Sequence, residues 1–115
     1  MVPAFAALLV LHGLIHLIGF AKAFGLADLP QLRGTISPIA GMLWLSAAIL
    51  FIYAAVALFA WPRVWPIVAV AAVVVSVAVI VPSWSDAKFG VVPNAIVAVT
   101  VLFGLLRHGP FILMR

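Results

Sequence analysis

The sequence predicts an all-α integral membrane protein, folded as an antiparallel bundle of four transmembrane helices. Hydrophobic residues make up 69% of the 115-residue chain and charged residues only 7%. Soluble domains carry about 25% charged and about 45–50% apolar residues, and a chain this short leaves much of its surface facing the solvent. We therefore expect that solvent to be lipid. The length allows one domain, over residues 1–115.

Four apolar stretches approach or exceed the roughly 20 residues that cross a hydrocarbon core of about 30 Å. The predicted spans are residues 2–22, 38–60, 65–82 and 88–106. Ser37 and Pro38 are typical of a helix N-cap and first helical position, and the prolines, arginine and tryptophans of Trp61–Pro66 indicate a turn at headgroup level. A last helix starting at Pro93 would be too short, so we expect it to begin near Asp86 and bend at the proline.

The charged residues are typical of membrane anchors and not of a nucleic-acid surface. The net charge of +4 comes from six cations that stand singly between apolar runs, whereas nucleic-acid binding needs clustered cations. No cation precedes Lys22, which favours a retained first helix over a secretory signal peptide. Three cations lie on each side of the predicted membrane, so the count of cations is tied, and acids contribute little to the positive-inside rule. Both acids lie opposite the termini, and on this remaining difference we expect cytoplasmic termini.

One group of charged residues occupies the connections on a single side of the bundle. Two hypotheses fit it: ion pairs that clamp the bundle, or lysines that reach the interface and anchor the helices. Anchoring is the simpler interpretation. The group comprises Lys22, Asp28, Arg33, Asp86 and Lys88.

A histidine pair inside the first span is the clearest candidate for a site. His12 and His16 are four residues apart and therefore share one helix face, and ionisable side chains within a membrane usually face the bundle interior or a polar cavity. Gly19 and Ala23 continue this face, and small residues there let a second helix approach closely.

Counting residues from the membrane interface predicts partners for the histidines. His16 lies six residues, about 9 Å at 1.5 Å per residue, inward of Lys22, and Asn94 lies six residues inward of Lys88 on the same side. Two serines reach slightly deeper positions on the second and third spans. The sequence thus predicts a ligand-binding pocket of polar residues, namely His12, His16, Ser46, Ser76 and Asn94.

Three chemical roles for the histidines are open at this point. Neutral imidazoles that hydrogen-bond between helices would set helix register without chemistry. The pocket could instead bind a ligand, a proton or a quinone. As a third role, a histidine pair at positions i and i+4 could hold zinc or copper if a third ligand were present. The zinc motif HExxH is not matched, because its glutamate is absent. No intramembrane acid pairs with a histidine, so autonomous catalysis is not expected.

Two segments resemble known bacterial membrane proteins. His12-Gly13, followed by Lys22-Ala23-Phe24-Gly25 and Pro30, resembles the first helix and loop of DoxX-like four-helix membrane proteins, and Asp86-Ala87-Lys88-Phe89-Gly90 leading into Asn94 is similar to small bacterial membrane proteins with the same number of spans. The resemblance implies a four-helix bundle and, in some members, a subunit passing electrons from a sulfur compound to quinone. His16 stands near the family's lysine position, so no family site residue carries over.

From the sequence we expect a binding or accessory subunit of the membrane, without catalysis of its own. The alternatives are a quinone-linked redox subunit and a metal-binding or small-solute transport unit. The expected partners are the lipid bilayer and either another membrane protein or further copies of this chain. No cofactor is predicted, although quinone or a metal would suit two of these roles.

Overall fold

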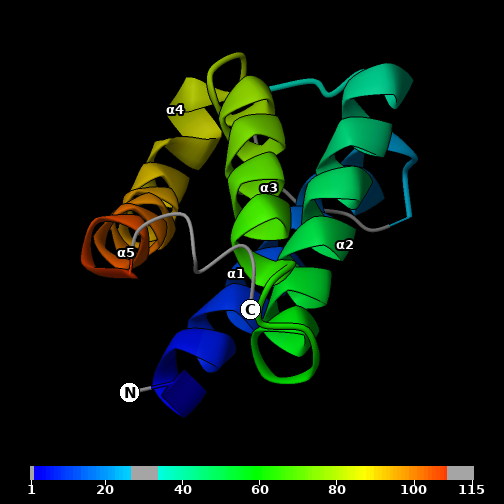
Figure 1. The fold of residues 1–115 in the computed structure, drawn as a ribbon. Helices are drawn as coiled ribbons and strands as arrows, with labels where there is room; N and C mark the ends of the chain where they lie inside the picture. Colours follow the sequence, from blue (N-terminus) through cyan, green and yellow to red (C-terminus); the bar gives the residue numbers. More distant parts are fainter. Residues whose placement is uncertain (1, 27–33, 109–115) are drawn as a thin grey trace.

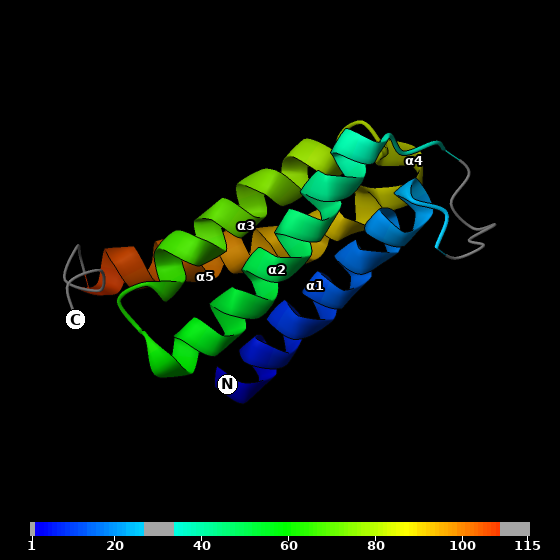
Figure 2. The ribbon, with the colours of Figure 1, turned by 90° about the vertical axis from the view of Figure 1, so that its right-hand side faces the viewer.

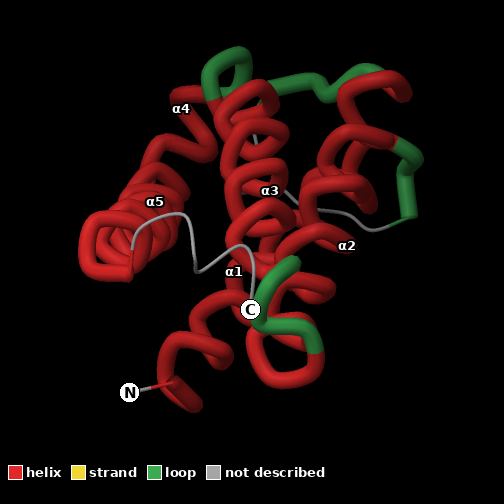
Figure 3. The backbone as a smooth tube through the Cα atoms, in the orientation of Figure 1, coloured by secondary structure: helices red, strands yellow, loops and turns green. Residues whose placement is uncertain are grey.

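The computed structural model describes residues 2–26 and 34–108, and this part of the chain is helical without strands (Figures 1 and 3). The all-α prediction is therefore confirmed for these residues. The helices in chain order are α1 (Val2–Ala23), α2 (Pro38–Ala60), α3 (Trp65–Ile80), α4 (Trp84–Ala87), the 3₁₀ turn η1 (Lys88–Gly90) and α5 (Val91–His108).

The long helices run alternately up and down, so that the start of α1 and the end of α5 lie at the same end of the bundle (Figure 2). Helices α1, α2 and α3 pack side by side in chain order, and α5 packs mainly on α3 while touching α1 at few places. The bundle is consequently tight between α1 and α2 and looser between α1 and α5.

Small residues explain the tight contact of α1 with α2. A Cβ atom at Gly13 would lie 3.0 Å from the carbonyl oxygen of Ala48, and a Cβ at Gly19 would overlap the indole of Trp44. A Cβ at Gly41 would overlap that of Ala23. The glycine–alanine face of the first span thus brings the two backbones together, as close packing of small residues does in membrane bundles.

Helix α3 is shorter than the predicted span 65–82, since it ends at Ile80. Pro82 causes this difference, because its ring lacks an N–H and clashes with the preceding turn. The 16 residues of α3 cover about 24 Å at 1.5 Å per residue. The turns that flank it at Trp61–Val64 and Val81–Ser83 would have to complete a crossing.

The fourth span breaks earlier than predicted. Instead of one helix bending at Pro93, the chain forms the short helix α4, the 3₁₀ turn η1 and then α5, whose third residue is Pro93. A proline in the first turn of a helix costs no hydrogen bond, because the N–H there has no partner within the helix. The irregular turn therefore falls at Lys88–Gly90, before the proline.

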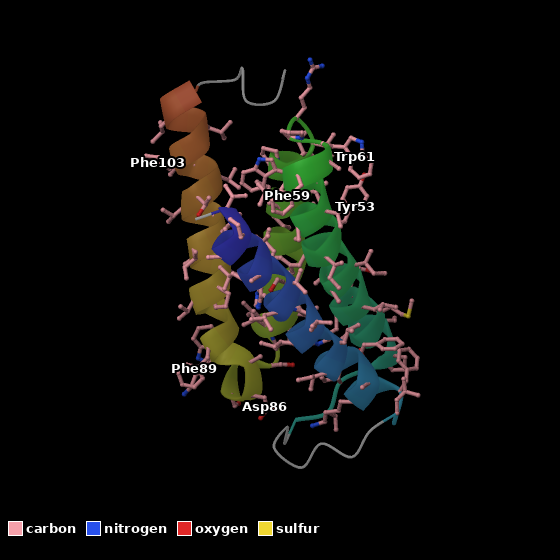
Figure 4. All side chains as sticks on the ribbon, turned by 90° about the horizontal axis from the view of Figure 1, so that it is seen from below. Tyr53, Phe59, Trp61, Asp86, Phe89 and Phe103 are labelled. Atoms are coloured by element: carbon pink, nitrogen blue, oxygen red, sulfur yellow. The ribbon has the colours of Figure 1, made fainter. Side chains whose placement is uncertain are left out.

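Large apolar side chains cover the outside of the bundle. Ile39, Phe103 and Leu106 are 78%, 60% and 77% exposed, and side chains project outward along the helices in Figure 4. Three segments are long and apolar enough to cross a membrane by length and composition, namely Val2–Ala23, Pro38–Ala60 and the α4–η1–α5 segment from Trp84 to Leu106.

Candidate functional site

Four buried polar side chains from three helices form one hydrogen-bonded network. His12 Nε2 lies 2.9 Å from Asn94 Oδ1, Asn94 Nδ2 lies 2.8 Å from Ser76 Oγ, and Ser76 Oγ lies 2.7 Å from His16 Nε2. His16 Nδ1 lies 2.8 Å from the carbonyl oxygen of His12. The four residues are at most 3% exposed, so the network connects α1, α3 and α5 inside the bundle.

The partners of each atom assign the direction of every bond. A carbonyl oxygen only accepts, so His16 Nδ1 donates to His12, and Nε2 of the neutral ring accepts from the Ser76 hydroxyl. The single hydroxyl hydrogen of Ser76 is then used, and Ser76 Oγ accepts from Asn94 Nδ2. Asn94 Oδ1 accepts in turn from His12 Nε2, which leaves Nδ1 of the neutral His12 as an acceptor.

Aromatic rings hold the two imidazoles in place. The rings of His12 and His16 meet edge to face, with centroids 4.5 Å apart. Phe51 of α2 packs against both, at 4.6 Å from His12 and 5.3 Å from His16, and Trp44 lies 5.1 Å from His16. With these contacts and the network, neither imidazole is free to turn.

A pocket of about 260 Å³ adjoins the network. Its walls come from the Gly19 end of α1, from Trp44 of α2, from the end of α3 and from residues 83–93, and they are mostly apolar. Ile15 and Phe89, two of the lining residues, are 55% and 78% exposed. The backbones of α1 and α5 approach each other at few places, and the exposed lining residues Ile15 and Phe89 place the pocket at the side of the bundle, between α1 and the α4–η1 segment.

Comparisons with protein-family models, curated proteins and solved structures found no match for this chain. The DoxX-like resemblance therefore stays a prediction. What the site can do has to be argued from its own residues.

Four of the five predicted residues meet in the network, and of these His12 and His16 also line the pocket, whereas Ser46 lies elsewhere. Ser46 is exposed, and its hydroxyl donates to the carbonyl oxygen of Met42 in its own helix, 2.8 Å away. Its predicted place in the pocket was wrong because counting residues gives a depth and not a direction around the helix axis. The buried face of α2 carries Trp44, Ala48 and Phe51, and Ser46 points away from it.

The predicted charged group is described only in part. Asp86 Oδ2 accepts a hydrogen bond of 2.8 Å from the backbone N–H of Gly34, so it ties the segment before α2 to α4 at the edge of the pocket. Lys88 Nζ lies 5.6 Å from the ring centroid of Phe89, and Lys22 lies in the last turn of α1. Asp28 and Arg33 lie outside the described residues. The clamping hypothesis stays a prediction.

The metal hypothesis lacks a third ligand in the part of the chain that the structure describes. No group of three or more histidine, cysteine or acidic side chains there could hold a metal ion. His12 and His16 each direct one ring nitrogen to another helix, and zinc sites need three or four protein ligands.

Sequence reasoning missed two residues that shape the pocket, Trp44 and Gly90. Trp44 lies three residues after Gly41, on the buried face of α2, and this helical spacing is the signal that could have placed it. A Cβ at Gly90 would lie 2.9 Å from Ile80 Cδ1 and 3.7 Å from His12 Cε1. Gly90 therefore keeps the space beside His12 open.

Proposed function

We propose that this protein is a four-span membrane protein that binds a small lipophilic molecule in the pocket beside His12 and His16. It acts as a binding or accessory subunit and carries out no catalysis of its own. The observation that carries the proposal is the pocket itself, which combines apolar walls with a buried polar network at the side of the bundle.

The outer surface supports the membrane part of the proposal. Within an apolar stretch of 18 residues in each of the three segments long enough to cross a membrane, 28%, 39% and 17% of the residues are buried inside the bundle, so most of these residues are not buried. Soluble monomers rarely expose apolar patches larger than a few hundred Å². Lipid would cover this surface, and helices satisfy their backbone hydrogen bonds internally.

Aromatic residues support the same arrangement. Tyr53 stacks on Trp61 with ring centroids 5.9 Å apart, and both lie at the end of the bundle opposite to Asp86 and Phe89 (Figure 4). Trp84 is exposed beside Asp86. Tryptophan is enriched at both membrane interfaces, so Trp61 and Trp84 mark the expected headgroup levels, whereas Tyr53 lies within the span α2.

The network supports a binding role over proton transfer. Asn94 connects His12 to Ser76 through its amide, and an amide has a fixed acceptor oxygen and fixed donor hydrogens. A proton arriving at His12 Nε2 could pass Asn94 only through an unstable imidic acid form. His12 and His16 line the pocket, and Ser76 and Asn94 behind them hold the two imidazoles in place.

A binding assay with a filled-pocket variant tests the proposal. The wild type, Gly90→Leu and Ala95→Leu are reconstituted in identical lipid nanodiscs, and binding of 2-naphthol and 2-methylnaphthalene is measured by equilibrium dialysis. Gly90→Leu adds a side chain beside Ile80 and His12, so it should lower binding of at least one probe tenfold or more. Ala95→Leu adds the same side chain to the exposed face of α5 and should leave binding unchanged. Equal binding of both probes by all three proteins would contradict the proposal.

A further inference from the structure

Two buried polar atoms in the described part of the chain have no hydrogen-bond partner, and both belong to residues that line the pocket. They are Nδ1 of His12 and Nε1 of Trp44. The side chains of these residues are 2% and 6% exposed. Buried polar groups almost always have a partner, so each exception points to a missing water, ion or ligand.

The two atoms have opposite requirements. The direction of the network makes His12 a donor at Nε2, toward Asn94 Oδ1, so Nδ1 of the neutral ring can only accept. The indole N–H of Trp44 can only donate. An occupant that satisfies both must offer a hydrogen to His12 and a lone pair to Trp44.

The other residues that line the pocket favour a ligand whose larger part is apolar. Ile15, Ile18, Ile80 and Phe89 contribute to its walls, and its position at the side of the bundle would open it to the hydrocarbon of a bilayer. An apolar cavity of about 150 Å³ binds benzene. The present volume of about 260 Å³ therefore accommodates a ring system larger than one benzene.

We infer that the pocket selects lipophilic alcohols or phenols, whose hydroxyl group donates to His12 and accepts from Trp44. This inference rests on the proposed function and names its ligand class. A ketone, ether or quinone carbonyl can accept from Trp44 but leaves His12 Nδ1 unpaired, and a hydrocarbon leaves both atoms unpaired. Because both atoms are buried, binding requires small shifts of the side chains that cover them.

Three probes of one ring system test the inference in nanodiscs. The compound 2-naphthol donates and accepts, 2-methoxynaphthalene only accepts, and 2-methylnaphthalene does neither. Binding to Gly90→Leu is subtracted for each probe, which removes partitioning into the lipid. We expect 2-naphthol to bind about tenfold more tightly than 2-methoxynaphthalene, as a hydrogen bond of about 1.4 kcal/mol provides. The methoxy compound should bind more tightly than 2-methylnaphthalene.

The variant Trp44→Phe separates the two atoms. The variant removes the indole N–H and retains an aromatic ring. Its affinity for 2-methoxynaphthalene should therefore equal its affinity for 2-methylnaphthalene. Its affinity for 2-naphthol should stay higher than both, because the hydroxyl group still donates to His12. Equal affinities of all three probes for the wild type would overturn the inference, because the two buried atoms would then have other partners, such as bound water. This result would leave the proposed function standing. If Gly90→Leu lowered the binding of none of the three probes, that result would refute the proposed function instead.

Discussion

Ser76→Ala is the most informative single substitution, because one hydroxyl group joins two halves of the buried network. Ser76 Oγ accepts from Asn94 Nδ2 at 2.8 Å and donates to His16 Nε2 at 2.7 Å. The alanine variant breaks both bonds and leaves an amide hydrogen and an imidazole nitrogen buried without partners, while the volume of the residue hardly changes.

The expected loss follows from these two bonds. Hydrogen bonds between membrane helices contribute about 0.6–2 kcal/mol each, so we expect the loss of both bonds in Ser76→Ala to lower the free energy of unfolding by roughly 1–4 kcal/mol. The assay is reversible unfolding of the purified protein in mixed micelles, followed by circular dichroism as the fraction of denaturing detergent rises.

Ser46→Ala is the matched control. Its hydroxyl bonds only to a carbonyl oxygen of its own helix and is exposed, so its removal should change the stability by less than about 0.5 kcal/mol. A Ser76→Ala variant as stable as Ser46→Ala would refute the view that the network holds α1, α3 and α5 together.

Two further substitutions test the contacts around the site. Gly19→Ala places a methyl group against the Trp44 indole and should destabilise the bundle by about 1–3 kcal/mol. The displaced indole should also shift the tryptophan fluorescence. A variant with unchanged stability and unchanged fluorescence would contradict this contact. Asp86→Ala removes the acceptor of the Gly34 N–H and should speed hydrogen exchange at Gly34 by up to about tenfold, whereas Asp86→Asn keeps an acceptor oxygen and should retain most of the protection. Unchanged exchange in Asp86→Ala would show that this bond does not hold the segment before α2.

Helix ends marked by local chemistry could be predicted from the sequence. Ser37 caps α2 by accepting from the N–H of Ala40 at 3.1 Å, and Pro38 begins the helix as expected. The end of α3 and the turn η1 deviate from prediction. Pro82 lies two residues after the end of α3, and Pro93 lies in the first turn of α5, just after η1. Proline cannot continue a helix but fits its first turn, and a simple count of apolar residues does not include this effect.

The buried network was predictable in depth but not in direction. His12 and His16 share a face by spacing alone, Asn94 matches the depth of His16, and Ser76 lies slightly deeper, and these four of the five residues meet. Ser46 has a similar depth but lies on the outer face of α2. The face that a helix turns toward the bundle is hard to predict in lipid, because such a helix carries apolar residues on all its faces. It therefore lacks the amphipathic pattern that orients helices in water.

The central claim is that the chain crosses a membrane four times, and cysteine labelling around the second and third spans tests the two middle crossings directly. The chain contains no cysteine, so Thr35→Cys, Arg63→Cys and Ser85→Cys each give a single reactive thiol at an exposed connection. In intact cells, a membrane-impermeant maleimide should label residues 35 and 85 and label residue 63 only after lysis. The reverse pattern would invert the expected orientation while keeping these two crossings. Labelling of all three positions from the same side would contradict the account.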